Sequence, residues 1–266
     1  MNRFARIPLA GALLLLAAAT AGAQSPMPPT PEEILDRAAK AQFGDRIDGL
    51  KSYRVDGTYS FPADNLVGKL LVLVSAPNKS LSRIEFPGAG VYVSAFDGTT
   101  GWSRDPSGYQ TKAGAELAAI KFYAEVRGDS EWRKRYKKWT YRGEQIVDGR
   151  KAWLIELEPE GLPITIQGFD AETWLPIVMR SQTDTPEGSR IQETRWADYR
   201  AIEDPAFGRI MMAHRTTETT GDQTSVMVFE KVVANVEIDE AVFAPPEAAP
   251  EAGDQKEPGN GKGSGK

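Results

Sequence analysis

Residues Arg150–Gln182 read RKAWLIELEPEGLPITIQGFDAETWLPIVMRSQ, with apolar and polar positions in alternation. Gly161 separates two alternating segments, which are Trp153, Ile155 and Leu157 against Glu156 and Glu158, then Ile164 and Ile166 against Thr165 and Gln167. A turn at Asp170–Thr173 leads into a third segment, Trp174–Gln182. A period of two residues places apolar side chains on one face of a strand and polar side chains on the other. The stretch therefore predicts two or three successive antiparallel strands with one apolar and one solvated face.

The same pattern recurs along the chain, in segments bounded by Gly, Pro, Asn or Asp. The further segments are Lys51–Phe61, Val67–Ser75, Lys79–Phe86, Val91–Phe96 with a hairpin to Trp102, Trp139–Val147, Ser189–Tyr199, Gly208–Thr217 and Thr224–Val236. Val67–Ser75 is apolar on both sides, which is typical of a strand covered on both faces.

Two main helices are expected, at Pro31–Gln42 with Thr30 as N-cap and at Ala113–Val126. A long sheet rarely stays open, and helices fill or cover its concave side. The sequence thus predicts an α+β fold, with a large antiparallel sheet of about 11–12 strands curled into an incomplete β-barrel and the two helices as a lid.

The two ends of the chain differ in composition from the middle. Residues 1–23 combine two arginines, an apolar core at Leu9–Ala19 and the small residues Ala21–Ala23, as in a cleaved secretory signal peptide. The apolar run is shorter than the about 20 residues of a membrane span, so we expect cleavage before Gln24 and no integral membrane segment afterwards. Residues 24–30 are predicted to be a Pro-rich lead-in, 31–246 a single domain, and 247–266 a disordered tail.

Composition restricts the chemistry. The chain has no cysteine, which removes disulfides, thiolate metal sites and a lipidated cysteine, and it has one histidine, His214. Loss of the signal takes the formal charge from −5 to −7, which makes nucleic acid a poor partner. We therefore expect no catalytic triad, no metal site and no cofactor. Carboxylates are plentiful, so an acid pair of the glycosidase type stays open.

A basic and aromatic cluster follows the second helix. It comprises Trp132, Arg133, Lys134, Arg135, Tyr136, Lys137, Lys138 and Trp139. Such a cluster can contact phosphate headgroups or an acidic partner. The interpretation that we favour is a solvated helix whose aromatic side chains dock it on the sheet.

The predicted strands share one broad apolar surface that suits an acyl chain. Its proposed ligand-binding members are Tyr59, Phe61, Leu70, Val72, Val74, Trp153, Ile155, Leu157, Ile164, Ile166, Ile177 and Met179. The same residues are what a filled sheet core requires. Two hypotheses therefore stand, a carrier with a partly vacant hollow and a non-catalytic envelope interaction or structural protein with a filled core.

The order of the turns resembles a known family. The similarity rests on five segments, Ser52–Tyr59, Ala76–Lys79, Phe96–Trp102, Val147–Trp153 and Asp170–Pro176, and extends over most of Pro31–Pro246. These segments resemble the outer-membrane lipoprotein-sorting proteins, the LolA/LolB-like periplasmic carriers.

The resemblance implies an incomplete β-barrel with a helical lid over an apolar cavity, which in that family shelters the acyl groups of lipoproteins crossing the periplasm. It implies a periplasmic transport chaperone of outer membrane biogenesis, binding acyl chains of lipoproteins or lipids, with envelope membrane proteins as further candidate partners. No catalytic residue carries over, because the family has none. The missing cysteine places the chain nearer the soluble carrier than the lipid-anchored receptor.

Overall fold

The computed structural model describes residues 28–185 and 188–246. The predicted signal peptide at 1–23, most of the lead-in and the predicted tail at 247–266 lie outside the described residues. The described residues form one antiparallel sheet of 13 strands, in the order β6-β5-β4-β3-β2-β1-β13-β12-β11-β10-β9-β8-β7. The sheet is therefore two meanders, joined where β1 pairs with β13, and β6 and β7 are its edges.

The first meander contains β1 (Ser52–Phe61), β2 (Leu66–Ser75), β3 (Lys79–Phe86), β4 (Gly90–Phe96), β5 (Gly101–Asp105) and β6 (Gly108–Thr111). The second contains β7 (Tyr136–Val147), β8 (Arg150–Pro159), β9 (Thr165–Asp170), β10 (Pro176–Thr185), β11 (Gly188–Asp204), β12 (Gly208–Thr220) and β13 (Gln223–Ala234). The helices are α1 (Pro31–Phe43), α2 (Gly114–Ala124) and α3 (Trp132–Arg135), with 3-10 turns η1 (Ile47–Gly49), η2 (Pro62–Asp64), η3 (Gly128–Glu131) and η4 (Glu240–Phe243).

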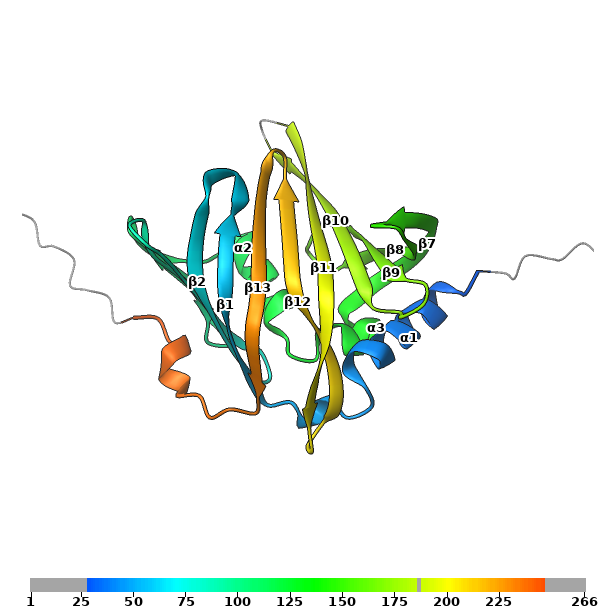
Figure 1. Ribbon diagram of the computed structural model, residues 1–266, viewed down its shortest axis with the longest axis horizontal. Helices are drawn as coiled ribbons and strands as arrows, with labels where there is room; N and C mark the ends of the chain where they lie inside the picture. The colour runs from blue at the N-terminus through cyan, green and yellow to red at the C-terminus, as the bar shows by residue number, and fades with distance from the viewer. Residues whose placement is uncertain (1–27, 186–187, 247–266) are drawn as a thin grey trace, which may run out of the picture.

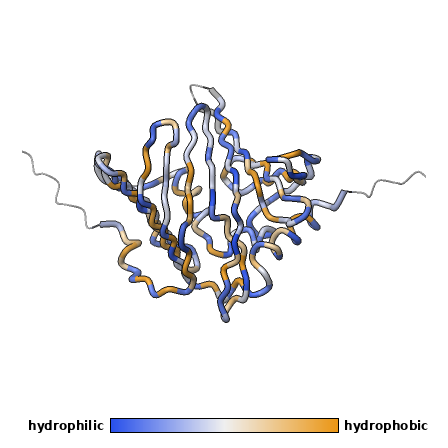
Figure 2. The backbone as a smooth tube through the Cα atoms, viewed as in Figure 1, coloured by the Kyte–Doolittle hydropathy of each residue, from blue (hydrophilic) through white to orange (hydrophobic). Residues whose placement is uncertain are grey.

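The sheet is curled and unclosed, and α2 lies behind its central strands in Figure 1, with α1 and α3 toward β7–β9. The predicted fold class, an incomplete β-barrel with helices, is confirmed. The strand missing from the prediction is β6, whose four residues are all exposed and carry no alternation. Figure 2 shows hydrophobic and hydrophilic residues mixed along the strands, as a sheet with two differently covered faces requires.

Helix α1 begins at a capping box, as the sequence predicts for Thr30. The Thr30 hydroxyl accepts from the Glu33 N–H at 3.2 Å, and the Glu33 carboxylate accepts from the Thr30 N–H at 3.0 Å. One face of α1 is buried against β8 and β9, through Ile34, Leu35 and Ala38 on the helix and Trp153, Ile155, Leu157 and Phe169 on the strands. This helix is the cover for the sheet that the sequence predicts.

A C-terminal strap, Asn235–Phe243, crosses the convex face of the first meander, at the lower left of Figure 1. Phe243 is fully buried against Leu81 and Trp102, and the Trp102 indole N–H donates to the Phe243 carbonyl at 2.9 Å. Leu73 of β2 packs on the same cluster. The strap therefore explains why β2 is apolar on both sides.

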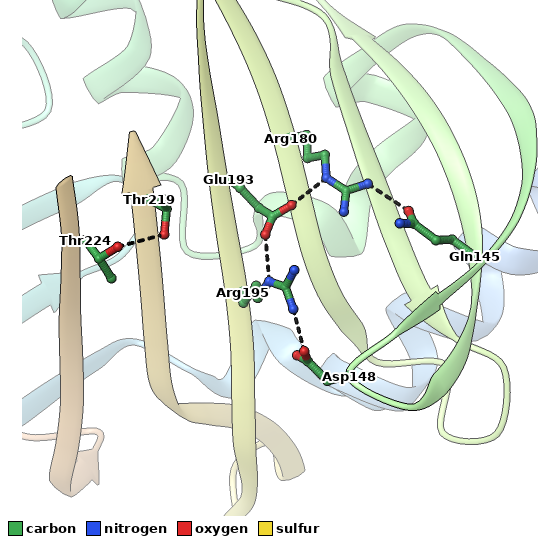
Figure 3. Close-up of polar contacts among 7 residues, drawn as sticks. All are labelled: Gln145, Asp148, Arg180, Glu193, Arg195, Thr219 and Thr224. Carbon is green, nitrogen blue, oxygen red and sulfur yellow. Dashed lines mark hydrogen bonds and ion pairs between the residues drawn. The ribbon is translucent and has the colours of Figure 1, made fainter. Parts of the chain in front are cut away.

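An ion-pair network lies on the convex face of the second meander (Figure 3). Arg180 donates to Glu193 at 2.6 Å and to Gln145 at 2.8 Å, while Arg195 donates to Glu193 at 2.6 Å and to Asp148. Partial burial acts to raise the pKa of Glu193, but the hydrogen bonds from both guanidinium groups hold it below its ordinary value. The network ties the tip of the β7–β8 hairpin to β10 and β11.

Candidate ligand-binding site

A pocket of about 340 Å³ lies on the concave face, between the second meander and the helices. Its apolar wall includes Leu50, Phe122, Val126, Trp196, Met211 and Met212. The volume falls at the lower end of the about 300–1,000 Å³ typical of small-molecule pockets. Three methionines in the wall, Met179, Met211 and Met212, suit a flexible apolar ligand, because unbranched side chains adapt to irregular shapes.

The pocket exists because α2 covers the sheet without filling it. Ala124 is the one buried residue of α2, and Tyr123 remains 60 % exposed. Helix α2 has apolar side chains on nearly every side, so no single face directs it into the sheet. Its N-cap residue, Ala113, has no side-chain acceptor for the N–H groups of the first turn.

One of the twelve proposed ligand-binding residues, Met179, lines this pocket. Trp153, Ile155 and Leu157 lie on the same concave face, but α1 buries them. Over β8 the hollow is therefore filled by a helix of the protein itself.

Five more proposed residues lie on the concave face of the first meander, away from the pocket: Tyr59, Phe61, Leu70, Val72 and Val74. Strand pairing places Val74 opposite Tyr53, a pocket residue, so the two surfaces are continuous. Tyr59 and Phe61 form an aromatic cluster with Phe86, with ring centroids 5.3 to 6.2 Å apart. A ligand role for these five residues stays a prediction.

Ile164 and Ile166 do not face inward, and the expected orientation is wrong. Ile166 is paired with Glu156, so it projects from the convex face, and Ile164 is 49 % exposed. Thr165 and Gln167 occupy the concave face instead, where both are buried and line the pocket. The pattern misled because alternation fixes two faces of a strand but assigns the polar face to solvent, and here the polar face borders a cavity.

Ile177 also lies off the concave face. The register between β9 and β10 shifts between Pro176 and Val178, so Ile177 sits at an irregularity in the pairing. Its side chain is buried in a cluster with Val147, Ala152 and Val178. Ala152 projects from the face opposite to its neighbour Trp153, so this cluster belongs to the convex side.

The charged groups of the pocket neutralise one another. The Arg135 guanidinium lies 3.0 Å from Asp129 and 3.4 Å from Glu125, and it stacks 3.6 Å from the Phe122 ring centroid. The Tyr136 hydroxyl donates to Asp129 at 2.9 Å. Burial, together with the nearby Asp129 charge, raises the pKa of Tyr136.

Tyr53, at the other side of the pocket, also stays neutral. Burial raises the pKa of this phenol to about 12. Because Arg135 is paired, the pocket wall formed by the described residues offers no free cation to a ligand.

The basic and aromatic cluster docks α3 and the start of β7 on α1, and its residues Tyr136–Trp139 belong to the strand and not to the predicted helix. Arg133 donates two hydrogen bonds to Asp36, at 2.6 and 2.8 Å, and lowers the pKa of that carboxyl. The Trp132 indole also donates to Asp36, at 3.1 Å, and the Trp139 indole donates to Glu32 at 2.6 Å. These contacts support the docking interpretation over phosphate recognition.

His214 is buried, and its Nδ1 lies 2.6 Å from the Phe229 carbonyl oxygen. Among the described residues, no group of three or more His, Cys, Asp and Glu side chains is placed to hold a metal ion. Within residues 28–185 and 188–246, no helix has the length and apolar character needed to cross a membrane.

No protein-family model matches the chain, and no curated protein matches it by sequence. Several solved structures match it by fold. A domain from Vibrio parahaemolyticus, described as an outer membrane lipoprotein-sorting protein, matches with a TM-score of 0.52 and 11 % identity, covering 79 % of this chain and 94 % of its own.

A DUF1329 family protein from Desulfovibrio piger matches with a TM-score of 0.54 and 13 % identity, covering 82 % of this chain and 98 % of its own. A LolA superfamily protein from Nitrosomonas europaea matches with a TM-score of 0.51 and 14 % identity, covering 82 % and 99 %. The resemblance read from the turns is thus confirmed for the fold: the chain has a LolA-like fold.

Proposed function

We propose that the protein is a soluble periplasmic carrier or binding protein for acylated cargo, a lipoprotein or a lipid, held in the concave pocket. The export signal predicted at residues 1–23 supports the compartment. The LolA-like fold and the names of its structural neighbours support the class of cargo. The protein acts by binding, without catalysis.

The observation that carries the proposal is the vacant space under α2. Clefts lined mainly by apolar side chains are typical of small-molecule sites. The pocket of about 340 Å³ is walled by aromatic, methionine and aliphatic side chains and opens to solvent, so a ligand can enter it. An apolar ligand explains it, because such walls gain free energy when an acyl chain replaces water.

The second candidate function is an envelope interaction protein with a filled core. The burial of Trp153, Ile155 and Leu157 under α1 favours it, because this part of the concave surface is filled by the chain itself. Under this hypothesis the pocket would be a packing defect that takes up no ligand.

The test measures lipid in the purified protein, by organic-solvent extraction and mass spectrometry, and uptake of the neutral fluorophore 1-N-phenylnaphthylamine. Ala213 lines the pocket and is 9 % exposed, so Ala213→Phe should fill the space. The matched control is Ala197→Phe, on the adjacent strand at an exposed position.

We expect the wild-type protein and Ala197→Phe to bind the fluorophore alike, and Ala213→Phe to bind it about tenfold more weakly, which corresponds to about 1.4 kcal/mol. Circular dichroism checks that each variant is folded. Val126→Trp, which enters the pocket from the helical side, replaces Ala213→Phe if that variant does not fold. A wild-type protein without co-purified lipid and without fluorophore uptake would overturn the proposal.

A further inference from the structure

The pocket has a polar corner, formed by Gln42, Asp129, Tyr136, Thr165 and Gln167. A smaller hollow beneath α1 is lined by four of them, Gln42, Asp129, Tyr136 and Gln167. These side chains therefore surround the point where the two hollows meet, between the end of α1, η3 and β9.

Gln167 and Thr165 have no side-chain hydrogen bond to any described residue, although they are only 5 % and 7 % exposed. Gln167 is paired with Ile155 on one side and Met179 on the other, so its immediate neighbours across the sheet are apolar. Neither residue is among the fully enclosed polar groups without a partner, so their polar atoms are accessible from the pocket that both residues line. The Gln167 amide is therefore available for hydrogen bonds to a polar group of a ligand in the pocket.

The charge balance of the corner restricts that partner. Asp129 already accepts from Tyr136 and pairs with Arg135, and Arg135 also pairs with Glu125. Asp129 and Arg135 are the two charged residues in the described pocket wall, so an ionised carboxylate or phosphate would be buried without a free cation. An uncharged group that accepts hydrogen bonds meets no such penalty.

We propose that Gln167, with Thr165 beside it, binds the uncharged carbonyl of the ester or amide that links an acyl chain to its carrier molecule. The Gln167 amide and the Thr165 hydroxyl donate to the carbonyl oxygen, and the Gln167 carbonyl accepts the N–H when the link is an amide. The chain then extends along the apolar wall toward Met211 and Met212. This inference rests on the proposed function and adds the part of the cargo that the pocket recognises.

The experiment is displacement of 1-N-phenylnaphthylamine from the full-length protein by a ten-carbon series: decane, methyl decanoate, N-methyldecanamide, decanoate and decylamine. The test variants are Gln167→Met, which keeps the length of the side chain and removes the amide, and Thr165→Val, which keeps its shape. The matched control is Gln110→Met, at an exposed position of the edge strand β6.

We expect the ester or the amide to bind the wild-type protein about tenfold more tightly than decane, and Gln167→Met to lower that preference to about twofold or less. Binding of decane should not change in Gln167→Met, and Gln110→Met should behave as the wild type. Thr165→Val should reduce the preference by a smaller factor, and it carries the test alone if Gln167→Met does not fold. Tighter binding of the amide would identify an N-acyl link, and tighter binding of the ester would identify an ester lipid.

Decanoate or decylamine binding more tightly than both neutral carbonyl compounds would overturn the inference. Equal binding of the whole series, unchanged in Gln167→Met, would also overturn it and would leave the proposed function standing. A protein that takes up neither the fluorophore nor any ligand of the series would instead reject the proposed function.

Discussion

Two helices cover the concave face of the sheet, and they pack in opposite ways. Helix α1 has a capping box and buries Ile34, Leu35 and Ala38 to 5 % exposure or less. Helix α2 has no side-chain cap and buries Ala124 alone. The sheet is therefore closely covered beneath α1, apart from a small hollow, and open at the larger pocket that Phe122 and Tyr123 of α2 border. The difference lies in the helices.

The sequence of each helix explains its packing. In α1, PEEILDRAAKAQF, charged residues occupy the outer side and a narrow apolar stripe faces the sheet, so the helix docks in one orientation. In α2, GAELAAIKFYA, apolar residues occur all around, so no orientation is strongly preferred. A cover of this kind can lie over a pocket without sealing it.

The comparison predicts that truncations on the solid side have the largest effect on stability. Leu157→Ala, at 1 % exposure beneath α1, should lower the free energy of unfolding by about 2–5 kcal/mol, because the cavity left behind cannot collapse. Leu117→Ala, half-buried on α2, should lower it by about 1 kcal/mol or less. Urea denaturation measures both, and equal losses would remove the distinction between the two helices.

The helix caps give a smaller effect, with opposite signs for the two substitutions. Thr30→Ala should destabilise the protein by about 1 kcal/mol, because it leaves the Glu33 N–H without its acceptor. Ala113→Ser should stabilise α2 by about 0.5 kcal/mol, because it supplies the side-chain cap that this helix lacks. Thermal denaturation followed by circular dichroism compares the two variants. No loss in Thr30→Ala would show that packing alone holds α1.

Two glutamates, one on each face of the sheet, should give the smallest effects, with opposite dependence on pH. Glu218 lies two residues from the pocket residue Thr216 on β12, and burial raises its pKa above the ordinary 4.5. A raised carboxyl pKa means that the ionised form is penalised in the folded state, so stability falls as pH rises through that range. Glu218→Gln should therefore stabilise the protein at about pH 8 and have little effect at about pH 4.

Glu193, on the convex face, has a lowered pKa because of Arg180 and Arg195, which outweigh the effect of its burial. Its contribution is present above the unfolded value near 4.5 and is lost as pH falls through the lower folded value. Glu193→Gln should destabilise the protein at about pH 8, and the difference from wild type should shrink toward about pH 3. Melting temperatures across this range measure both variants, and parallel curves for the two would contradict the opposite directions of the two pKa shifts.

The sequence predicts most of the sheet, because turns and alternation are local properties. The strands from β1 to β5 and from β7 to β13 have recognisable turn residues at their ends, whereas β6 has four exposed residues and no pattern. The polar corner could not be predicted. Thr165 and Gln167 look like solvent-facing strand residues, and only the placement of α1, η3 and the curl of the sheet turns them inward.

The filling of the hollow over β8 is equally beyond local reasoning. Trp153, Ile155 and Leu157 have the pattern of a cavity wall, and nothing in their own segment indicates that a helix over 100 residues away in sequence covers them. Alternation identifies a face of a strand, while the identity of its cover is a tertiary property.

The strap on the convex face is part of the folded unit. A chain shortened to Ala234, the end of the last strand, would keep all 13 strands yet leave Leu81 and Trp102 without the Phe243 side chain that covers them. Exposed apolar patches of this kind favour self-association. A truncated form would therefore be expected to aggregate through its outer surface, even though its pocket and every strand pairing were intact.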